Sequence, residues 1–137
     1  MTQEEKAALS LVRLQRAFEC LATDRENCRL GEYRAAANRV YYAVFHAIRA
    51  VLAMDEIDMS KHSAVISEFR RRYLKTDILD RRFSGLITDA FEIRNESDYD
   101  DFYIVVKADV DQEIEDAKEF LETIRDYLAR RHNAENQ

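Results

Sequence analysis

The sequence predicts an all-α fold, an up-and-down bundle of four long helices and one short helix. The 137 residues include no proline and only two glycines, the residue types that most often interrupt helices. Alanine, leucine, glutamate and arginine are abundant, and all four favour helix formation. Apolar residues recur every three or four positions along most of the chain, as in amphipathic helices. A chain of this length forms a single domain around one core, so the fold class applies to residues 1–137.

The first long helix is predicted at about residues 4–29. Gly31 follows its last turn, where a residue that tolerates positive φ can end the helix. We expect one face to pack on the core and the charged face to contact solvent. The apolar face has 3-4-3 spacing and consists of Leu11, Leu14, Phe18 and Leu21.

The second long helix, at about residues 32–54, carries two different stripes. A plain surface helix would show lysine and glutamate opposite its core stripe, whereas this one shows arginines, a tyrosine and a histidine. We therefore expect both sides of the helix to be covered. The core stripe is Val40, Val44, Ala47, Ile48 and Val51, and the opposite stripe is Arg39, Tyr42, His46 and Arg49, with Tyr41 and Phe45 between the two.

Three more helices are predicted at about residues 61–73, 79–97 and 107–131. We expect Ser60 to cap the first of them and Gly85 to mark a close helix contact in the second. The tail beyond residue 131 is expected to fray. The last helix has the spacing typical of left-handed bundles, with apolar residues at Val110, Ile114, Ala117, Leu121, Ile124 and Leu128.

Charge and cysteine usage narrow the functional classes. A net charge of −6 and a pI near 5.1 argue against a broad, non-specific grip on nucleic-acid phosphates, although a local basic cleft is compatible with both. The polar N-terminus and the lack of a long apolar run predict a cytoplasmic protein without a membrane partner. Cys20 and Cys28 lie about 12 Å apart along one predicted helix, so we expect no disulfide between them.

Arg94 interrupts an apolar stripe. The inward positions of its helix are Phe83, Ile87 and Ala90, and the next step of the 4-3-4 spacing falls on Arg94. A guanidinium group stays charged and needs a carboxylate, a phosphate or carbonyl groups. Two interpretations follow: a structural ion pair with an aspartate in the next turn, or an arginine that lines a polar cleft and binds phosphate.

The acids and histidines give weaker signals. Asp98, Asp100 and Asp101 lack the spacing of a calcium loop, so we predict neither a metal nor a cofactor. No histidine has a partner four positions away, which excludes the usual helical zinc motif. We expect His132 and His62 to lie at the surface. His46 falls on the second stripe, where it is either a hydrogen-bonded histidine at a subunit contact or a catalytic group.

Three blocks of sequence, in this order, resemble the HEPN superfamily and in particular its small stand-alone prokaryotic branch. They are "YRAAANRVYYAVFHAIRAVL" at 33–52, "SKHSAVISEFRRRYLKTDILD" at 60–80 and "AFEIRNESDY" at 90–99. The likeness covers roughly residues 8–130. It implies a helical bundle that forms a homodimer around a shared cleft, with Arg39, Tyr41, Tyr42, His46 and Arg49 at the dimer contact and the cleft wall.

The resemblance also implies a function. Many members of the superfamily are metal-independent endoribonucleases, often toxins encoded beside a minimal nucleotidyltransferase antitoxin, and others bind nucleotides or RNA without cleaving it. In related toxin pairs the antitoxin adenylylates a tyrosine near the catalytic motif, which makes Tyr99 and Tyr103 candidates for that modification.

The catalytic signature of the ribonuclease members is only half present. That signature is an arginine and a polar residue followed, after four to six positions, by a histidine. Arg94 and Asn95 match its start, but Tyr99, Asp100 and Asp101 occupy the positions where the histidine would stand. We therefore assign Arg94, Asn95, Asp98 and Tyr99 as candidate catalytic residues, with His46 as a candidate recruited from another helix.

Three functional hypotheses follow, one of which is a purely structural adaptor in which Arg94 contributes only to stability. The first is a toxin-like or RNA-processing protein that acts on RNA through a dimer cleft centred on Arg94. The alternative is a non-catalytic nucleotide-binding or regulatory module that acts with a minimal nucleotidyltransferase partner, which the acidic balance and the absent histidine favour.

Overall fold

The computed structural model of the chain describes residues 1–135, and all regular secondary structure in that range is helical. The predicted all-α class is therefore confirmed. Each of the five predicted helices has a counterpart in the structure. The elements are α1 (Gln3–Arg29), α2 (Tyr33–Ala53), α3 (His62–Phe69), a π-helical turn (Arg70–Leu74), α4 (Phe83–Tyr99) and α5 (Lys107–Glu135).

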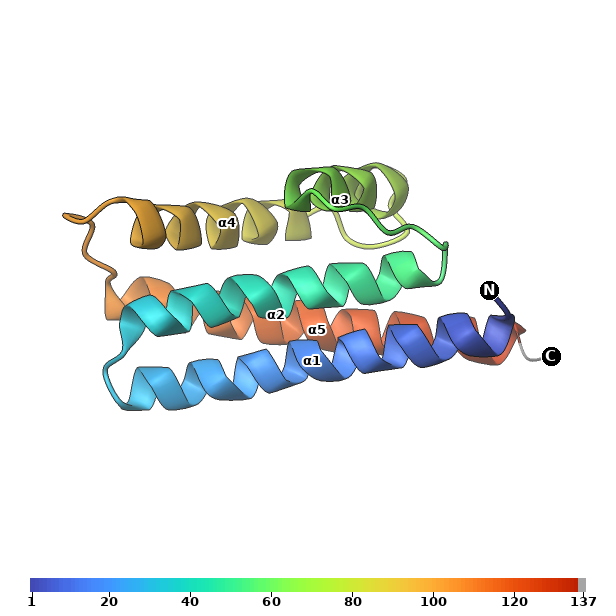
Figure 1. The fold of residues 1–137 in the computed structure, drawn as a ribbon, viewed down its shortest axis with the longest axis horizontal. Helices are drawn as coiled ribbons and strands as arrows, with labels where there is room; N and C mark the ends of the chain where they lie inside the picture. The colour runs from blue at the N-terminus through green and yellow to red at the C-terminus, as the bar shows by residue number, and fades with distance from the viewer. Residues whose placement is uncertain (136–137) are drawn as a thin grey trace.

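Helix α2 lies at the centre of the bundle. It packs against α1, α3, α4 and α5, and Figure 1 shows it between the α3–α4 layer and the α1–α5 layer. The α1–α2 turn and the α4–α5 loop lie at one end of the bundle, and both termini lie at the other end. The core stripe predicted for α2 is buried throughout, as are all six apolar positions predicted for α5. This up-and-down arrangement places the second stripe of α2 beside α3 and α4.

Local sequence signals account for the ends of α1. The Thr2 hydroxyl accepts a hydrogen bond from the Glu5 backbone N–H at 3.1 Å, which caps the first turn. After Arg29 the chain turns at Gly31, whose φ of +79° lies in the left-handed region that glycine adopts without a steric penalty. The predicted stop signal is thus confirmed, and it allows α2 to return antiparallel along α1.

Several helix ends differ from prediction. Helix α3 begins after Lys61 instead of after a Ser60 cap, and no side chain caps its first turn. Helix α4 begins at Phe83, because residues 75–82 form turns in which the Arg82 backbone N–H bonds to Asp80. The expectation of a close helix contact at Gly85 was wrong, since a methyl group placed there would meet nothing within 4 Å.

Helix α5 runs four residues past its predicted end. Arg131 holds this last turn, because its guanidinium bonds to Asp55 Oδ1 at 2.9 Å and to the Tyr73 hydroxyl at 2.9 Å. His132 is half-buried instead of solvent-exposed, with Nε2 at 3.3 Å from Met54 Sδ. The expectation of a frayed tail after residue 131 was therefore wrong as far as Glu135.

The buried face of α1 is more polar than its sequence suggested. Leu11, predicted to face the core, is 52% exposed, whereas Ser10 and Asp24 are fully buried. Arg13 is also buried, because it reaches across to the α2 backbone and donates to the Arg49 carbonyl oxygen at 3.2 Å. Leu14 and Leu21 are buried and Phe18 packs on the core as predicted, so only Leu11 of the predicted face was wrong. None of the described helices combines the length and apolar composition that crossing a bilayer requires.

Candidate functional site

Arginines and aromatic rings from three helices meet on one side of α2. We call this surface the basic aromatic face and define it by Arg39, Tyr42 and Arg49 of α2, His62 of α3 and Arg94 of α4. All five residues are half-buried, and they surround the buried ring of Tyr41. The chain is acidic as a whole, whereas this face brings three of its 21 lysines and arginines together at one place.

Arg94 lies across the tyrosines of α2. Its Cζ is 5.0 Å from the ring centroid of Tyr41 and 5.8 Å from that of Tyr42, distances at which a guanidinium and a ring attract each other. Its side chain is 19% exposed, so it is neither a core residue nor a free surface arginine. The predicted inward direction of Arg94 is confirmed, and the aromatic rings fix where its charge sits.

Arg94 also pairs with Asp98, one helical turn further along α4. The Arg94 Nε atom lies 3.1 Å from Asp98 Oδ2. The same Nε makes no hydrogen bond, because the N–H and the carboxylate are not aligned. The contact is therefore an electrostatic pair at a half-exposed position, which contributes little stability. Of the two interpretations of Arg94, the ion pair exists, but it leaves the terminal nitrogens of the guanidinium without a hydrogen-bond partner among the described residues.

His62 lies beside Tyr41 and Arg94, contrary to the expectation of a simple surface residue. The Tyr41 hydroxyl and His62 Nδ1 are 2.8 Å apart, and the His62 ring stacks on Phe45 at a centroid distance of 4.1 Å. Burial, followed by the charge of Arg94, lowers the pKa of His62 below its ordinary value. Burial raises the pKa of Tyr41 to about 12, so its hydroxyl keeps its proton. His62 is thus a neutral, oriented imidazole whose Nε2 forms no hydrogen bond to another described residue.

His46 has a different environment from His62. Burial, followed by the charges of Arg16, Arg49, Arg39 and Arg13 in that order, lowers its pKa to about 4. Its Nδ1 is buried and has no hydrogen-bond partner among the described residues, so the hydrogen-bonded histidine expected there does not form within the chain. Because His46 stays neutral at ordinary pH, it is a poor proton donor.

A shallow cavity of about 400 Å³ opens next to His62. Arg49 and Asp58 line it, and their side chains form an ion pair at 3.1 Å. Arg13 shares the same carboxylate at 3.5 Å, so two arginines converge on one acid. The positive charge of this pair of arginines is only half neutralised. A phosphate-sized anion in the cavity would meet Arg49, His62 and the unpaired part of that charge.

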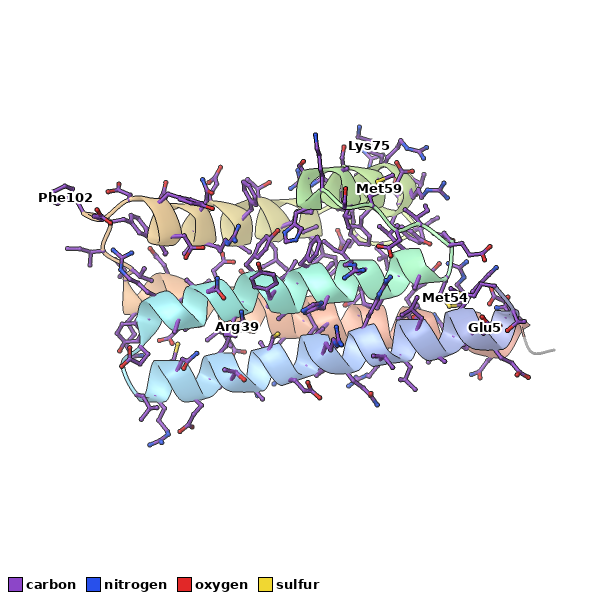
Figure 2. The ribbon with its side chains drawn as sticks, viewed as in Figure 1. Glu5, Arg39, Met54, Met59, Lys75 and Phe102 are labelled. Carbon is purple, nitrogen blue, oxygen red and sulfur yellow. The ribbon has the colours of Figure 1, made fainter. Side chains whose placement is uncertain are left out.

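The other predicted motif residues contact little. Asn95 and Tyr99 are exposed, Tyr99 by 75%, and neither side chain forms a hydrogen bond within the described residues. Tyr103 is half-buried in the α4–α5 loop. Figure 2 shows Phe102 of the same loop at the far tip, directed away from the bundle, and it is 94% exposed. Asp98 is the only residue after Arg94 in the motif that touches it.

Arg39 completes the face toward α1. Its guanidinium lies over the Tyr42 ring at 5.0 Å and bonds to the Asn38 side chain at 2.7 Å. Figure 2 shows Arg39 on α2 close to α1, where its charge lowers the pKa of Asp24, while burial raises it to about 9 overall. The face therefore extends from α4 across α2 to α1.

Two residues that hold the site were missed in the sequence. His62 is an isolated histidine at a helix start, and its partners on α2 are 21 residues away. Arg34 donates hydrogen bonds to the backbone carbonyl groups of Ser97 and Tyr103, which ties the end of α4 and its loop to α2. The only signal for either residue was its place inside a block of family resemblance, the second block for His62 and the first for Arg34.

The face does not fit a metal ion. Within residues 1–135, no three histidine, cysteine or carboxylate side chains lie close enough to hold one. The polar groups of the face are mainly cationic, which favours an anionic ligand.

Comparison with known proteins agrees with the family resemblance. The HEPN domain matches residues 11–127 of this chain. The chain is 31% identical over 96 residues to the protein named "Putative toxin MJ0142" of Methanocaldococcus jannaschii, which is 70% of this chain and 65% of that protein. It is also 31% identical over 110 residues to a "UPF0332 protein" of Thermotoga maritima, covering 80% of this chain and 83% of the relative.

A third relative, "Putative toxin MJ0605" of Methanocaldococcus jannaschii, is 31% identical over 67 residues, half of its length. The chain thus spans just under two thirds of one relative named as a toxin and half of the other. The matched region, residues 11–127, includes α2, α3 and α4 and hence every residue of the basic aromatic face. With the bundle architecture and this match over most of its length, the chain belongs to the HEPN domain family.

Proposed function

We propose that this protein is a toxin-like RNA-targeting protein whose site is the basic aromatic face. The observation that carries the proposal is the meeting of Arg94, His62 and Tyr42 on one surface of an otherwise acidic chain. Two of the relatives are named as toxins, which supports the toxin-like part of the proposal. The alternative of a nucleotide-binding module has no comparable observation in its favour.

The face has the two features that single-stranded RNA requires. Arginine guanidinium groups bind phosphates through paired hydrogen bonds, and Arg39, Arg49 and Arg94 are each half-buried and oriented. Aromatic rings stack on bases regardless of sequence, and Tyr42 lies among these arginines. An acidic chain with one such face would bind RNA there and repel it elsewhere.

The same residues allow a chemical step. In RNA cleavage the 2′-oxygen attacks the adjacent phosphorus, the bond from phosphorus to the 5′-oxygen breaks, and a cyclic phosphate forms. When His62 donates Nδ1–H to the Tyr41 oxygen, its neutral Nε2 can accept the 2′-hydroxyl proton. Arg94 can stabilise the charge that develops on the phosphorane, and water supplies the proton for the leaving 5′-oxygen. In this proposal His62 of α3 takes the role of the absent motif histidine.

Induced expression in a bacterial host tests the proposal. We expect the wild type to arrest growth and to reduce total RNA integrity. Arg94→Ala and His62→Gln should each abolish both effects, because each removes a group that has no substitute on the face. Arg130→Ala and His132→Gln are matched controls on α5, outside the face, and should behave as the wild type does.

Binding and cleavage are separated with purified protein and single-stranded RNA. If the wild type binds RNA but leaves it intact, the face is a binding site and the chemical step above is wrong. If cells tolerate the wild type and the protein neither binds nor cleaves RNA, the whole proposal is wrong. Thermal melting of each variant shows whether a loss of effect reflects unfolding.

The partners remain predictions. A homodimer would bring two copies of the face together, and light scattering of the purified protein at several concentrations tests for it. Co-expression with a minimal nucleotidyltransferase encoded nearby tests for an antitoxin, which should restore growth. Adenylylation would add the mass of one or more AMP groups, and Tyr99→Phe should prevent it if the exposed Tyr99 is the acceptor and Tyr103 is not.

A further inference from the structure

A row of carboxylates on each of two helices borders a groove on the side of α4 that faces α5. Gln112 and Ile93 complete its walls, and among the described residues no lysine or arginine lines it. The groove encloses a cavity of about 330 Å³. We call it the acidic groove and define it by Asp89, Glu92 and Glu96 of α4 and Asp109, Glu113 and Asp116 of α5.

The six carboxylates of the groove have no cationic partners. None of them takes part in an ion pair with another described residue, although the rest of the surface is rich in such pairs. Glu96 lies in the last turns of α4, where the helix dipole disfavours negative charge. Gln112 donates a hydrogen bond to Asp116 at 2.9 Å, and Asp109 lies in the first turn of α5, where the helix dipole favours an acid. No cation within residues 1–135 pairs with any of the six acids, so most of the repulsion in the groove is not neutralised.

The burial of Glu113 is an independent observation that points to a ligand in the acidic groove. Its side chain is 7% exposed and its Oε2 atom is buried without a hydrogen-bond partner. It lines the acidic groove on one side and a small apolar void beside Ala37 and Val40 on the other. A buried carboxylate oxygen without a donor costs free energy. A cation that enters the groove can supply that donor.

The arrangement of the acids indicates the shape of the cation. Asp89, Glu92 and Glu96 have i, i+3, i+7 spacing and lie on one face of α4, spread over about 10 Å along the axis. Asp109, Glu113 and Asp116 form the matching row on α5. No three of these carboxylates converge closely enough for a metal ion. Charges spread along a line match a ligand whose own charges are spaced along a chain, and the volume is that of a small-molecule site.

We propose that the acidic groove binds a linear polyamine, with one ammonium group donating to Glu113 and the others lying along the two carboxylate rows. The methylene segments between the ammonium groups would pack on Ile93, the apolar residue of the groove wall. This site is separate from the basic aromatic face and does not depend on the function of that face.

Proton release should accompany binding. Burial, followed by the charges of Asp89 of α4 and of Asp116 and Asp109 of its own helix, raises the pKa of Glu113 to about 8. The residues of α2 beside Glu113, Ala37 and Val40, carry no charge. An ammonium group favours the ionised carboxylate, so affinity should increase as pH rises toward about 8.5, still below the pKa of an alkylammonium group.

Calorimetric titration of the full-length chain with spermidine tests the proposal. At about 0.15 M salt we expect saturable binding of one spermidine per chain, several-fold tighter near pH 8.5 than near pH 6.5. Glu113→Gln should weaken binding at the higher pH by about tenfold or more, because a charge-assisted hydrogen bond is lost. Glu115→Gln makes the same change on the exposed face of α5 and should alter the affinity by less than about twofold.

Other outcomes would overturn the proposal. Binding that does not saturate, or an equal loss in Glu115→Gln, would mean diffuse attraction to an acidic surface. Equal displacement of spermidine by Mg²⁺ would mean that a point charge suffices, and tighter binding of a lysine-rich peptide would assign the groove to a protein partner. If Glu113→Gln does not fold, judged by thermal melting, Asp89→Asn with Glu92→Gln provides the same comparison on exposed positions.

Discussion

Helix α4 separates two regions of opposite charge that are built in different ways. Toward α2 it presents Arg94, which rests on aromatic rings and joins a set of half-buried cations. Toward α5 it presents Asp89, Glu92 and Glu96, which face further acids. The cations of the basic aromatic face contact rings and carboxylates, whereas the acids of the groove pair with no cation among the described residues. One helix can therefore carry a basic surface and an acidic surface without cationic partners on opposite sides. Residues about 200° apart around the helix axis contact different neighbouring helices.

The largest expected effect tests how far the basic aromatic face is part of the core. Tyr41 is 2% exposed and contacts Phe45, His62 and Arg94, so Tyr41→Ala should lower the free energy of unfolding by about 3–5 kcal/mol. Tyr41→Phe keeps the ring and should cost only about 1 kcal/mol, the contribution of the hydrogen bond to His62. Urea unfolding of both variants measures the difference. Equal losses would mean that the hydroxyl matters more than the ring.

The acidic groove should limit stability at alkaline pH. Burial raises the pKa of Glu113 from 4.5 to about 8 in the folded state. The folded chain holds this proton over that range while the unfolded chain has released it, so stability falls as pH rises toward 8. Between about pH 5 and 8.5 the wild type should lose on the order of 2–3 kcal/mol that Glu113→Gln retains. Asp24 acts in the same direction in both proteins and does not affect the difference. Parallel curves for the two proteins would contradict the assignment.

His46, which lies beside Tyr42 of the basic aromatic face, should limit stability at acidic pH. Burial and the surrounding arginines lower the pKa of His46 from 6.5 to about 4 in the folded state. The unfolded chain binds a proton there that the folded chain excludes, so stability falls as pH decreases from 6.5 to 4. The loss should be on the order of 1–2 kcal/mol larger in the wild type than in His46→Gln. Titration of the His46 ring signals by NMR gives the pKa directly, and a value near 6.5 would remove the contrast between the two regions.

The smallest expected effect concerns the ion pair of the motif. Arg94 and Asp98 are close but not aligned, and Asp98 is 35% exposed, so Asp98→Asn should change the free energy of unfolding by less than about 0.5 kcal/mol. The same variant in the expression assay shows whether Asp98 matters for function. A loss of more than 2 kcal/mol, on the scale of a buried pair, would instead make the pair a structural anchor for Arg94.

Residues whose partners are local could be read from the sequence. The 4-3-4 spacing of α5 depends only on periodicity, and all of its predicted core positions are buried. The direction of Arg94 followed from the same periodicity, and Gly31 from the chemistry of one turn. In these cases the residues that determine the local structure are close to one another in the sequence.

Residues whose partners are distant could not be read in this way. His62 is an ordinary histidine until α3 packs on α2 and brings it to Tyr41. Glu113 is one of many charged residues on α5, and only the approach of α2 and α4 buries it. Leu11 was misplaced for the converse reason, since polar residues such as Ser10 and Arg13 occupy buried positions of α1 next to it. Whether a polar group is buried depends on which other elements cover it. The periodicity of residues along one helix gives no information about those elements.

The π-helical turn at Arg70–Leu74 has a consequence for how this chain can change length. Its hydrogen bond from the Lys75 N–H to the Arg70 carbonyl, at 2.9 Å, encloses one more residue than an α-helical turn would. Deleting a single residue there would convert the turn to a continuous α-helix and leave both neighbouring segments near their places. The same deletion inside α2 would rotate every later side chain by about 100° and turn its two stripes away from their partners. Single-residue gaps between this chain and its relatives should therefore collect at residues 70–74 and be absent from α2.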